Sequence, residues 1–203
     1  VGHLPTVIGT GIKVIATGVI LSICYLIIQY IIAGLIAKKN PFKCIWNIIP
    51  AYLTGFSICS SSAVIPVTLE CTMKNGATKE IANFTVPLCS TVHMCASTIT
   101  PITTSVAVMY LSGMNISFAL FVNFILLQGI SAVAAPGVMG GVLMASIGLL
   151  ESVLGFSPEQ SALMLTIYLA LDGYGPACNV SGDGAITLII DRFFAKKYAS
   201  AQQ

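Results

Sequence analysis

Residues 81–150 read IANFTVPLCSTVHMCASTITPITTSVAVMYLSGMNISFALFVNFILLQGISAVAAPGVMGGVLMASIGLL, and this stretch contains no Asp, Glu, Lys or Arg. As one straight helix, at about 1.5 Å per residue, it would be roughly 105 Å long. The hydrocarbon core of a bilayer is only about 30 Å thick. The stretch must therefore fold back on itself inside or beside a membrane.

The rest of the chain has the same apolar character. Its 203 residues are 56% hydrophobic and 8% charged, and the mean hydropathy is +0.93. A soluble domain carries about 25% charged residues, so we expect lipid to be the outer solvent of a multi-pass protein in the plasma (inner) membrane. The net charge of +2 and the lack of a dense basic run predict no nucleic-acid partner.

The cysteines and the first residue bound the answer further. The seven cysteines lie in apolar segments without a CxxC spacing, which favours buried thiols over disulfides or a zinc site. The chain begins at Val1 and has no signal-peptide pattern, so we expect additional scaffold helices upstream.

Three segments are long and apolar enough to cross a bilayer: Val14–Ala37, Ile81–Leu111 and Leu163–Ile190. The positive-inside rule assigns their lysine- and arginine-bearing ends, and with them the C-terminus, to the cytoplasm. The basic residues on that side are Lys38, Lys39, Lys43, Lys74, Lys79, Arg192, Lys196 and Lys197. The opposite side has Lys13 and loops that carry only Glu151 and Glu159.

Two further segments are too short in each arm to cross, and each enters and leaves on one side. Residues 46–73 turn at Cys59-Ser60-Ser61-Ser62 from the cytoplasmic side, and residues 118–156 turn at GISAVAAPG (129–137) from the other. Both patterns are typical of re-entrant helical hairpins with small-residue tips. A hairpin and a spanning helix from each side form an inverted repeat, with its site near the midplane.

The sequence thus predicts an all-α membrane protein with three spanning helices and two re-entrant hairpins. The expected units are residues 1–43, with a spanning helix and a cytoplasmic loop, then 44–115 and 116–203, each with one hairpin and one spanning helix.

The last helix carries Asp172, Asn179 and Asp183, whose spacings of 7 and 4 place them on one helical face. A carboxylate inside a bilayer costs at least about 2.5–3.5 kcal/mol, so both acids need partners. One interpretation is pairing for packing alone; the other is that Asp183 and Asn179 offer hard oxygens to a small cation. Gly173 to Pro176 should loosen the helix between them.

The preceding spanning segment holds hydroxyls, His93 and Pro101 in mid-span, which predicts a local break. His93 is either a hydrogen-bonded packing residue or a proton-linked site. The serines at 60–62 could offer hydroxyls and helix-start amides to a carboxylate, or form a plain turn. A serine nucleophile with His93 and Asp183 is conceivable, but no Gly-x-Ser-x-Gly elbow accompanies it, so we do not expect an enzyme.

These motifs resemble the dicarboxylate/amino acid:cation symporter family, the fold of the glutamate transporters. Residues 60–68, SSSAVIPVT, are similar to the first hairpin tip of that family. Residues 87–96, PLCSTVHMCA, fall where the family has Pro-Leu-Gly-Ala-Thr-(Ile/Val)-Asn-Met-Asp-Gly. Ala135-Pro136-Gly137 matches the second tip, and 172–183, DGYGPACNVSGD, matches the last helix.

The resemblance implies a sodium-coupled or proton-coupled symporter that works by an elevator motion, as a homotrimer in the complete protein. It implies a small-molecule substrate, Na⁺ as coupling ion and no other cofactor. The implied substrate-binding residues are Ser60, Ser61, Ser62, Thr98, Ala134, Pro136, Gly137, Asp172 and Asn179. The implied metal-binding residues are Cys89, Thr91, Met94, Gly129, Ile130, Ala132, Asn179 and Asp183, with His93 as a proton site.

Three departures from the family pattern alter these expectations. His93 and Cys95 replace an Asn and an Asp, which removes two oxygen ligands. Gly175 stands where members that carry acidic substrates have an Arg that grips a carboxylate. We therefore expect a neutral amino acid rather than glutamate or aspartate, and keep an uncoupled exchanger or channel as the alternative.

Overall fold

The computed structural model describes residues 4–115, 117–135 and 139–201, and in these ranges it contains helices and no strands. The expected all-helical chain is confirmed. Its elements are α1 (Leu4–Ala37), α2 (Pro41–Ile58), the short 3₁₀ turn η1 (Ser62–Val64), α3 (Ile65–Lys74), α4 (Lys79–Val92), α5 (Cys95–Leu111), α6 (Phe118–Ala134), α7 (Gly141–Leu154), α8 (Pro158–Leu171) and α9 (Tyr174–Ala201).

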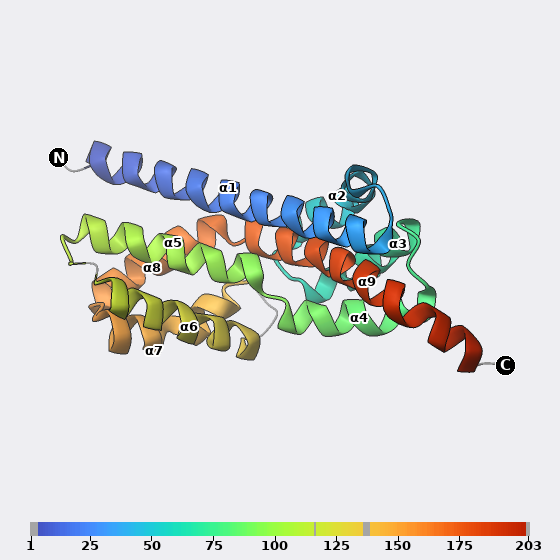
Figure 1. The fold of residues 1–203 in the computed structure, drawn as a ribbon. Helices are drawn as coiled ribbons and strands as arrows, with labels where there is room; N and C mark the ends of the chain where they lie inside the picture. Colours follow the sequence, from blue (N-terminus) through green and yellow to red (C-terminus); the bar gives the residue numbers. More distant parts are fainter. Residues whose placement is uncertain (1–3, 116, 136–138, 202–203) are drawn as a thin grey trace.

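Two helix pairs lie toward opposite ends of the molecule. In Figure 1, α2 and α3 lie in the half that contains the C-terminus, and α6 and α7 lie in the other half. The consecutive helices α4 and α5 run through both halves in one direction, and α8 and α9 run through both in the other. The inverted repeat itself stays a prediction.

Length and composition allow two stretches of the described chain to cross a membrane, Gly11–Ala37 and Lys79–Leu111. The second consists of α4 and α5 with the break between them. Membrane insertion of the two helix pairs stays a prediction.

Local sequence explains where the first helices stop and start. Lys38 takes a positive φ of 55°, and the Lys39 amide donates to Gly34 O at 2.9 Å, which is a Schellman-type end to α1. The Asn40 side chain then accepts from the first-turn amides of α2, and Pro41 occupies its first position. For this reason α2 begins at Pro41. The sequence pattern predicts a start near Trp46, five residues later.

The long runs α4–α5 and α8–α9 are each interrupted between their two helices. α4 ends at Val92 and α5 begins at Cys95, so His93 and Met94 lie in the predicted break. Asp172 is the C-cap of α8, and α9 starts at Tyr174. The prediction of one continuous face for Asp172, Asn179 and Asp183 is therefore wrong for Asp172, because the helix stops there. Asn179 and Asp183 remain one turn apart on α9.

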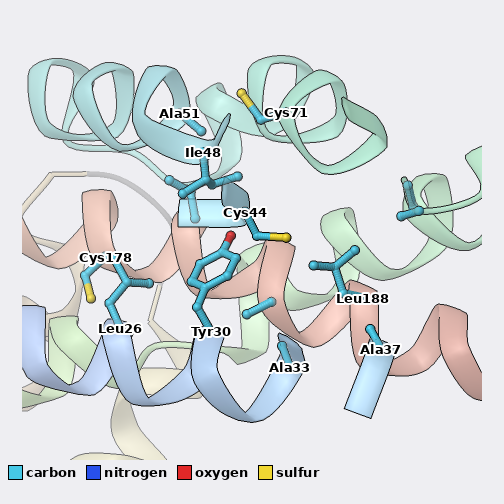
Figure 2. Close-up of a cluster of buried hydrophobic side chains, with 14 of the residues drawn as sticks. Leu26, Tyr30, Ala33, Ala37, Cys44, Ile48, Ala51, Cys71, Cys178 and Leu188 are labelled. Carbon is cyan, nitrogen blue, oxygen red and sulfur yellow. The ribbon is translucent and has the colours of Figure 1, made fainter. Parts of the chain in front are cut away.

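The largest core cluster joins α1, α2, α3 and α9. Figure 2 shows Tyr30 pointing from α1 toward Cys44 and Ile48 of α2. The Tyr30 hydroxyl is completely buried and donates to Ser181 O at 2.8 Å. This bond ties α1 to α9, the helix that carries Asn179 and Asp183.

Small residues let α2 approach the start of α9 closely. A Cβ on Gly55 would lie 3.0 Å from Ala177 Cα, and one on Gly173 would lie 2.7 Å from Phe56 O. The Phe56 and Tyr174 rings meet edge-on at 5.0 Å. The end of α2 that leads into the serine tip is therefore held against the break before α9.

Candidate functional site

A completely buried carboxylate lies at the centre of the site. Asp183 Oδ1 is 2.9 Å from His93 Nδ1, a hydrogen bond that becomes an ion pair when the His93 ring is protonated. Asp183 Oδ2 is buried and has no hydrogen-bond partner. A buried carboxylate oxygen without a donor is strongly disfavoured, and a proton or a small cation would satisfy it.

His93 is held from its other side by α1. Its Nε2 lies 2.9 Å from the Gln29 amide nitrogen, and Gln29 Oε1 is buried without a partner. With the amide N–H donating, His93 Nε2 must be an acceptor and the ring neutral. Rotation of the amide would instead offer Oε1 to a doubly protonated ring. The Gln29 orientation and the charge of His93 are therefore linked.

Asn179 is fully engaged with the start of α5. Its Oδ1 accepts from the Ala96 amide at 3.0 Å, and its Nδ2 donates to Ser97 Oγ at 2.7 Å. Its side chain is 1% exposed. Because the first amides of a helix lack intrahelical partners, Asn179 caps α5 across the break at His93 and Met94.

Asp172 makes a similar bond to the α6–α7 pair. Its Oδ2 accepts from the Gly140 amide at 2.6 Å, just before α7 begins. Asp172 is 4% exposed, and the Tyr168 hydroxyl faces the same carboxyl group. A short charge-assisted bond of this kind is among the stronger ones in proteins, so it holds the start of α7 against the end of α8.

Gly175 leaves no room for a side chain in this conformation. A Cβ there would lie 2.7 Å from Ser97 Oγ and 3.1 Å from Ser97 Cα. The hydroxyl could rotate away, but the backbone of α5 would also have to shift. The position that bears an arginine in the resemblance is thus closed by Ser97.

The serine tip follows α2 and ends at Ser62, the first residue of η1. Ser61 is 3% exposed, Ser62 is exposed, and Ser60 Oγ accepts from the Ala63 amide at 3.4 Å. The tip follows the end of α2, where Phe56 packs on Tyr174 just after the break between α8 and α9.

Five of the implied metal-binding residues come from two regions. Thr91 lies at the end of α4 and Met94 in the α4–α5 break, while Gly129, Ile130 and Ala132 lie in α6. Met94 packs with Ala132 in a small buried cluster, which brings the two regions together. The Met94 carbonyl is already used, because it accepts from Thr98 N at 3.0 Å and from Thr98 Oγ1 at 2.7 Å.

The remaining expected residues differ in their surroundings. Cys89 is buried in α4, and Ala134 is exposed at the end of α6. Pro136 and Gly137 lie outside the described residues. Within the described ranges, no three His, Cys, Asp or Glu side chains converge on one point. A cation here would rely on Asp183, amide and backbone oxygens, a donor set that suits a hard, weakly held ion.

Sequence reasoning missed Gln29, Ser97 and Gly140. Gln29 carries an amide inside an otherwise apolar run, and that isolated polar residue could have identified it. Ser97 was one of several hydroxyls in its stretch. Gly140 acts through its backbone amide, which leaves no side-chain signal.

The site is thus built where two interrupted helix pairs meet two helical hairpins, which is the general plan of a secondary transporter. Residues 3–193 match the sodium:dicarboxylate symporter family, and the chain belongs to this family.

Among curated relatives, the chain is similar to neutral amino acid transporter B(0) of Rattus norvegicus. The two are 30% identical over 173 residues, which cover 82% of this chain and 31% of that protein. It is also similar to excitatory amino acid transporter 3 of Mus musculus, 29% identical over 178 residues, which cover 87% of this chain and 34% of that protein. The chain spans about a third of the length of the curated relatives it matches. The family and these relatives are transporters, not enzymes.

Proposed function

We propose that this chain forms the substrate-carrying part of a cation-coupled amino acid symporter in the plasma (inner) membrane. The observation that carries the proposal is the pair of buried carboxylates, Asp172 and Asp183, one beside each helix break. Two buried acids that form no ion pair with a lysine or arginine among the described residues mark a route for cations or ammonium groups. Family membership supports the same assignment.

In this proposal, Asp172 receives the amino group of the substrate. Its Oδ2 is now bonded to the Gly140 amide, so an incoming ammonium group would join or replace that bond. Asn179 and the serine tip would receive the α-carboxylate, which requires the Asn179 bonds to Ala96 and Ser97 to be shared or released. Substrate binding would thereby be coupled to movement of the α6–α7 hairpin.

The substrate is proposed to be a neutral amino acid. Gly175 supplies no cation for a second carboxylate, and Ser97 occupies the space beside it. The only arginine of the chain is Arg192, which lies beyond the site toward the end of α9. An acidic side chain would therefore enter without a counter-charge, at a substantial desolvation cost.

The coupling ion is proposed to be Na⁺ held by Asp183 Oδ2 and nearby backbone oxygens, and released when the site opens. His93 gives a second candidate, coupling to a proton, because it already contacts the other oxygen of the same carboxylate. Both ions would act through Asp183, so a substitution there cannot tell them apart, whereas separate sodium and proton gradients can.

Transport by an elevator motion of this unit, in a homotrimer, completes the proposal. The test is uptake of a panel of amino acids by the purified protein in proteoliposomes, under separate sodium and proton gradients. Asp183→Asn should abolish coupled uptake. Asp191→Asn is the matched control, because Asp191 bonds the Thr78 amide at the start of α4, away from the site.

Each outcome has a clear meaning. Dependence on the sodium gradient identifies Na⁺, and dependence on the proton gradient alone identifies the His93 pair. Uptake that ignores both gradients, or exchange that runs without them, would support the uncoupled alternative. Normal coupled uptake by Asp183→Asn would refute the assignment of Asp183.

A further inference from the structure

A polar cavity lies away from the proposed transport site. Its volume is about 320 Å³, within the range of small-ligand pockets. It lies where the end of α1, the start of α2 and the end of α3 meet. The residues that line it are Lys39, Asn40, Lys43, Cys44, Asn47, Lys74, Asn75 and Gly76.

A network of hydrogen bonds gives this cavity a fixed wall. The buried Asn75 side chain donates to Cys44 O at 3.0 Å and accepts from Asn47 Nδ2 at 2.9 Å. The Lys39 ammonium donates to Asn75 O at 2.6 Å and to Gly76 O at 2.7 Å. Lys39 therefore stabilises the wall of the cavity, and its ammonium group is fixed at one edge.

Two other lysines line the cavity and do not bond to its wall. Lys43 and Lys74 are exposed, and neither ammonium has a hydrogen bond or ion pair with any residue that the structure describes. No carboxylate lines the cavity. Three lysines thus line a polar hollow that no carboxylate lines, and such an arrangement concentrates anions.

The neighbouring surface indicates where this cavity lies relative to lipid. Phe42 and Trp46, on the same helix as Lys43, are 71% and 73% exposed. Exposed aromatic rings beside lysines are typical of the membrane–water interface. The Asn40 side chain accepts hydrogen bonds from the Phe42 and Lys43 amides. An anion here would therefore be held by the lysines and not by free amides of the helix start.

We propose that this cavity binds a phosphate group at the membrane surface, through Lys43 and Lys74 against the fixed charge of Lys39. A phosphate monoester, with up to two negative charges and several acceptor oxygens, matches three ammonium groups better than a single carboxylate does. The group could belong to an anionic lipid headgroup or to free phosphate. Basic pockets between helices near the cytoplasmic surface commonly receive such headgroups.

The test is binding of three probes to the purified protein in detergent, measured by native mass spectrometry. The probes are dihexanoyl phosphatidic acid, dihexanoyl phosphatidylcholine and inorganic phosphate. The double variant Lys43→Gln/Lys74→Gln should bind phosphatidic acid about 25-fold more weakly, at about fivefold for each lysine near the surface. The charge-matched control is Lys13→Gln/Lys79→Gln, because neither residue lines the cavity.

The probes also separate the two sources of phosphate. Binding of phosphatidic acid without competition from inorganic phosphate identifies a lipid site, and competition identifies a site for the free ion. Both results support the proposal, provided that only the cavity variant is affected. Equal binding by the two double variants, or absence of phosphatidic acid and phosphate binding to the unaltered protein, would overturn it.

Discussion

The bond between Asp172 and Gly140 makes a quantitative prediction about the α6–α7 hairpin. In Asp172→Asn the side chain keeps its shape and can still accept from the Gly140 amide, which it now meets at 2.6 Å, but without the negative charge. Hydrogen bonds to charged groups contribute about 1.5–3 kcal/mol and neutral ones about 0.5–1.5 kcal/mol. The bonded position of the start of α7 should therefore be about 1 kcal/mol less stable relative to the released one. This difference corresponds to about fivefold more frequent release.

Hydrogen–deuterium exchange of a peptide covering residues 139–145 measures this release directly. The exchange rate should rise about fivefold in Asp172→Asn, because the amide is protected by the closed bond. Glu151→Gln, which removes an exposed carboxylate from the same helix, should leave the rate unchanged. An unaltered rate in Asp172→Asn would refute the reasoning that this carboxylate holds the hairpin.

Four further substitutions test the packing of the fold by thermal unfolding in detergent. Gly55→Ala should lower stability by about 1–3 kcal/mol, because its Cβ would lie 3.0 Å from the backbone of α9; an unchanged midpoint would contradict the close contact. Gly76 and Gly113 both have a positive φ, but only at Gly76 would a Cβ meet the Lys39 ammonium, at 2.5 Å. Alanine at either position should cost about 1 kcal/mol or more, and equal losses would show that Lys39 is not held in place. Ser157→Ala removes the capping box of α8, with an expected loss of about 1 kcal/mol; a variant as stable as the parent would count against that cap.

The order of elements could be predicted because it depends on charge and on turn-forming residues. The uncharged run and the small-residue tip predicted a segment over 118–156, and the structure has α6 and α7 there. The uncharged run predicts a spanning segment that begins at Val14, after Lys13, yet the helix that contains it begins at Leu4. A single lysine ends a hydropathic run but does not end a helix.

The identity of the site residues could be predicted better than their partners. Acids inside apolar segments are rare, so the sequence alone identifies Asp172 and Asp183 as candidate site residues. The groups that contact them, the Gly140 amide and the His93 ring, come from other elements. Which distant group reaches which carboxylate depends on the packing of those helices, and nothing in local sequence specifies it.

The three polar residues that accept bonds from other helices suggest why the site and the fold use the same side chains. Asp172 bonds the amide before α7, Asn179 bonds an amide in the first turn of α5, and Asp191 bonds the amide before α4. Each satisfies a helix start that would otherwise lack an acceptor. Two of these acceptors are the ones that the proposed substrate needs. A ligand with its own amino and carboxylate groups would compete for them and loosen the starts of α7 and α5 together. The interrupted helices would then be the means by which occupancy of the site is transmitted to the α6–α7 hairpin.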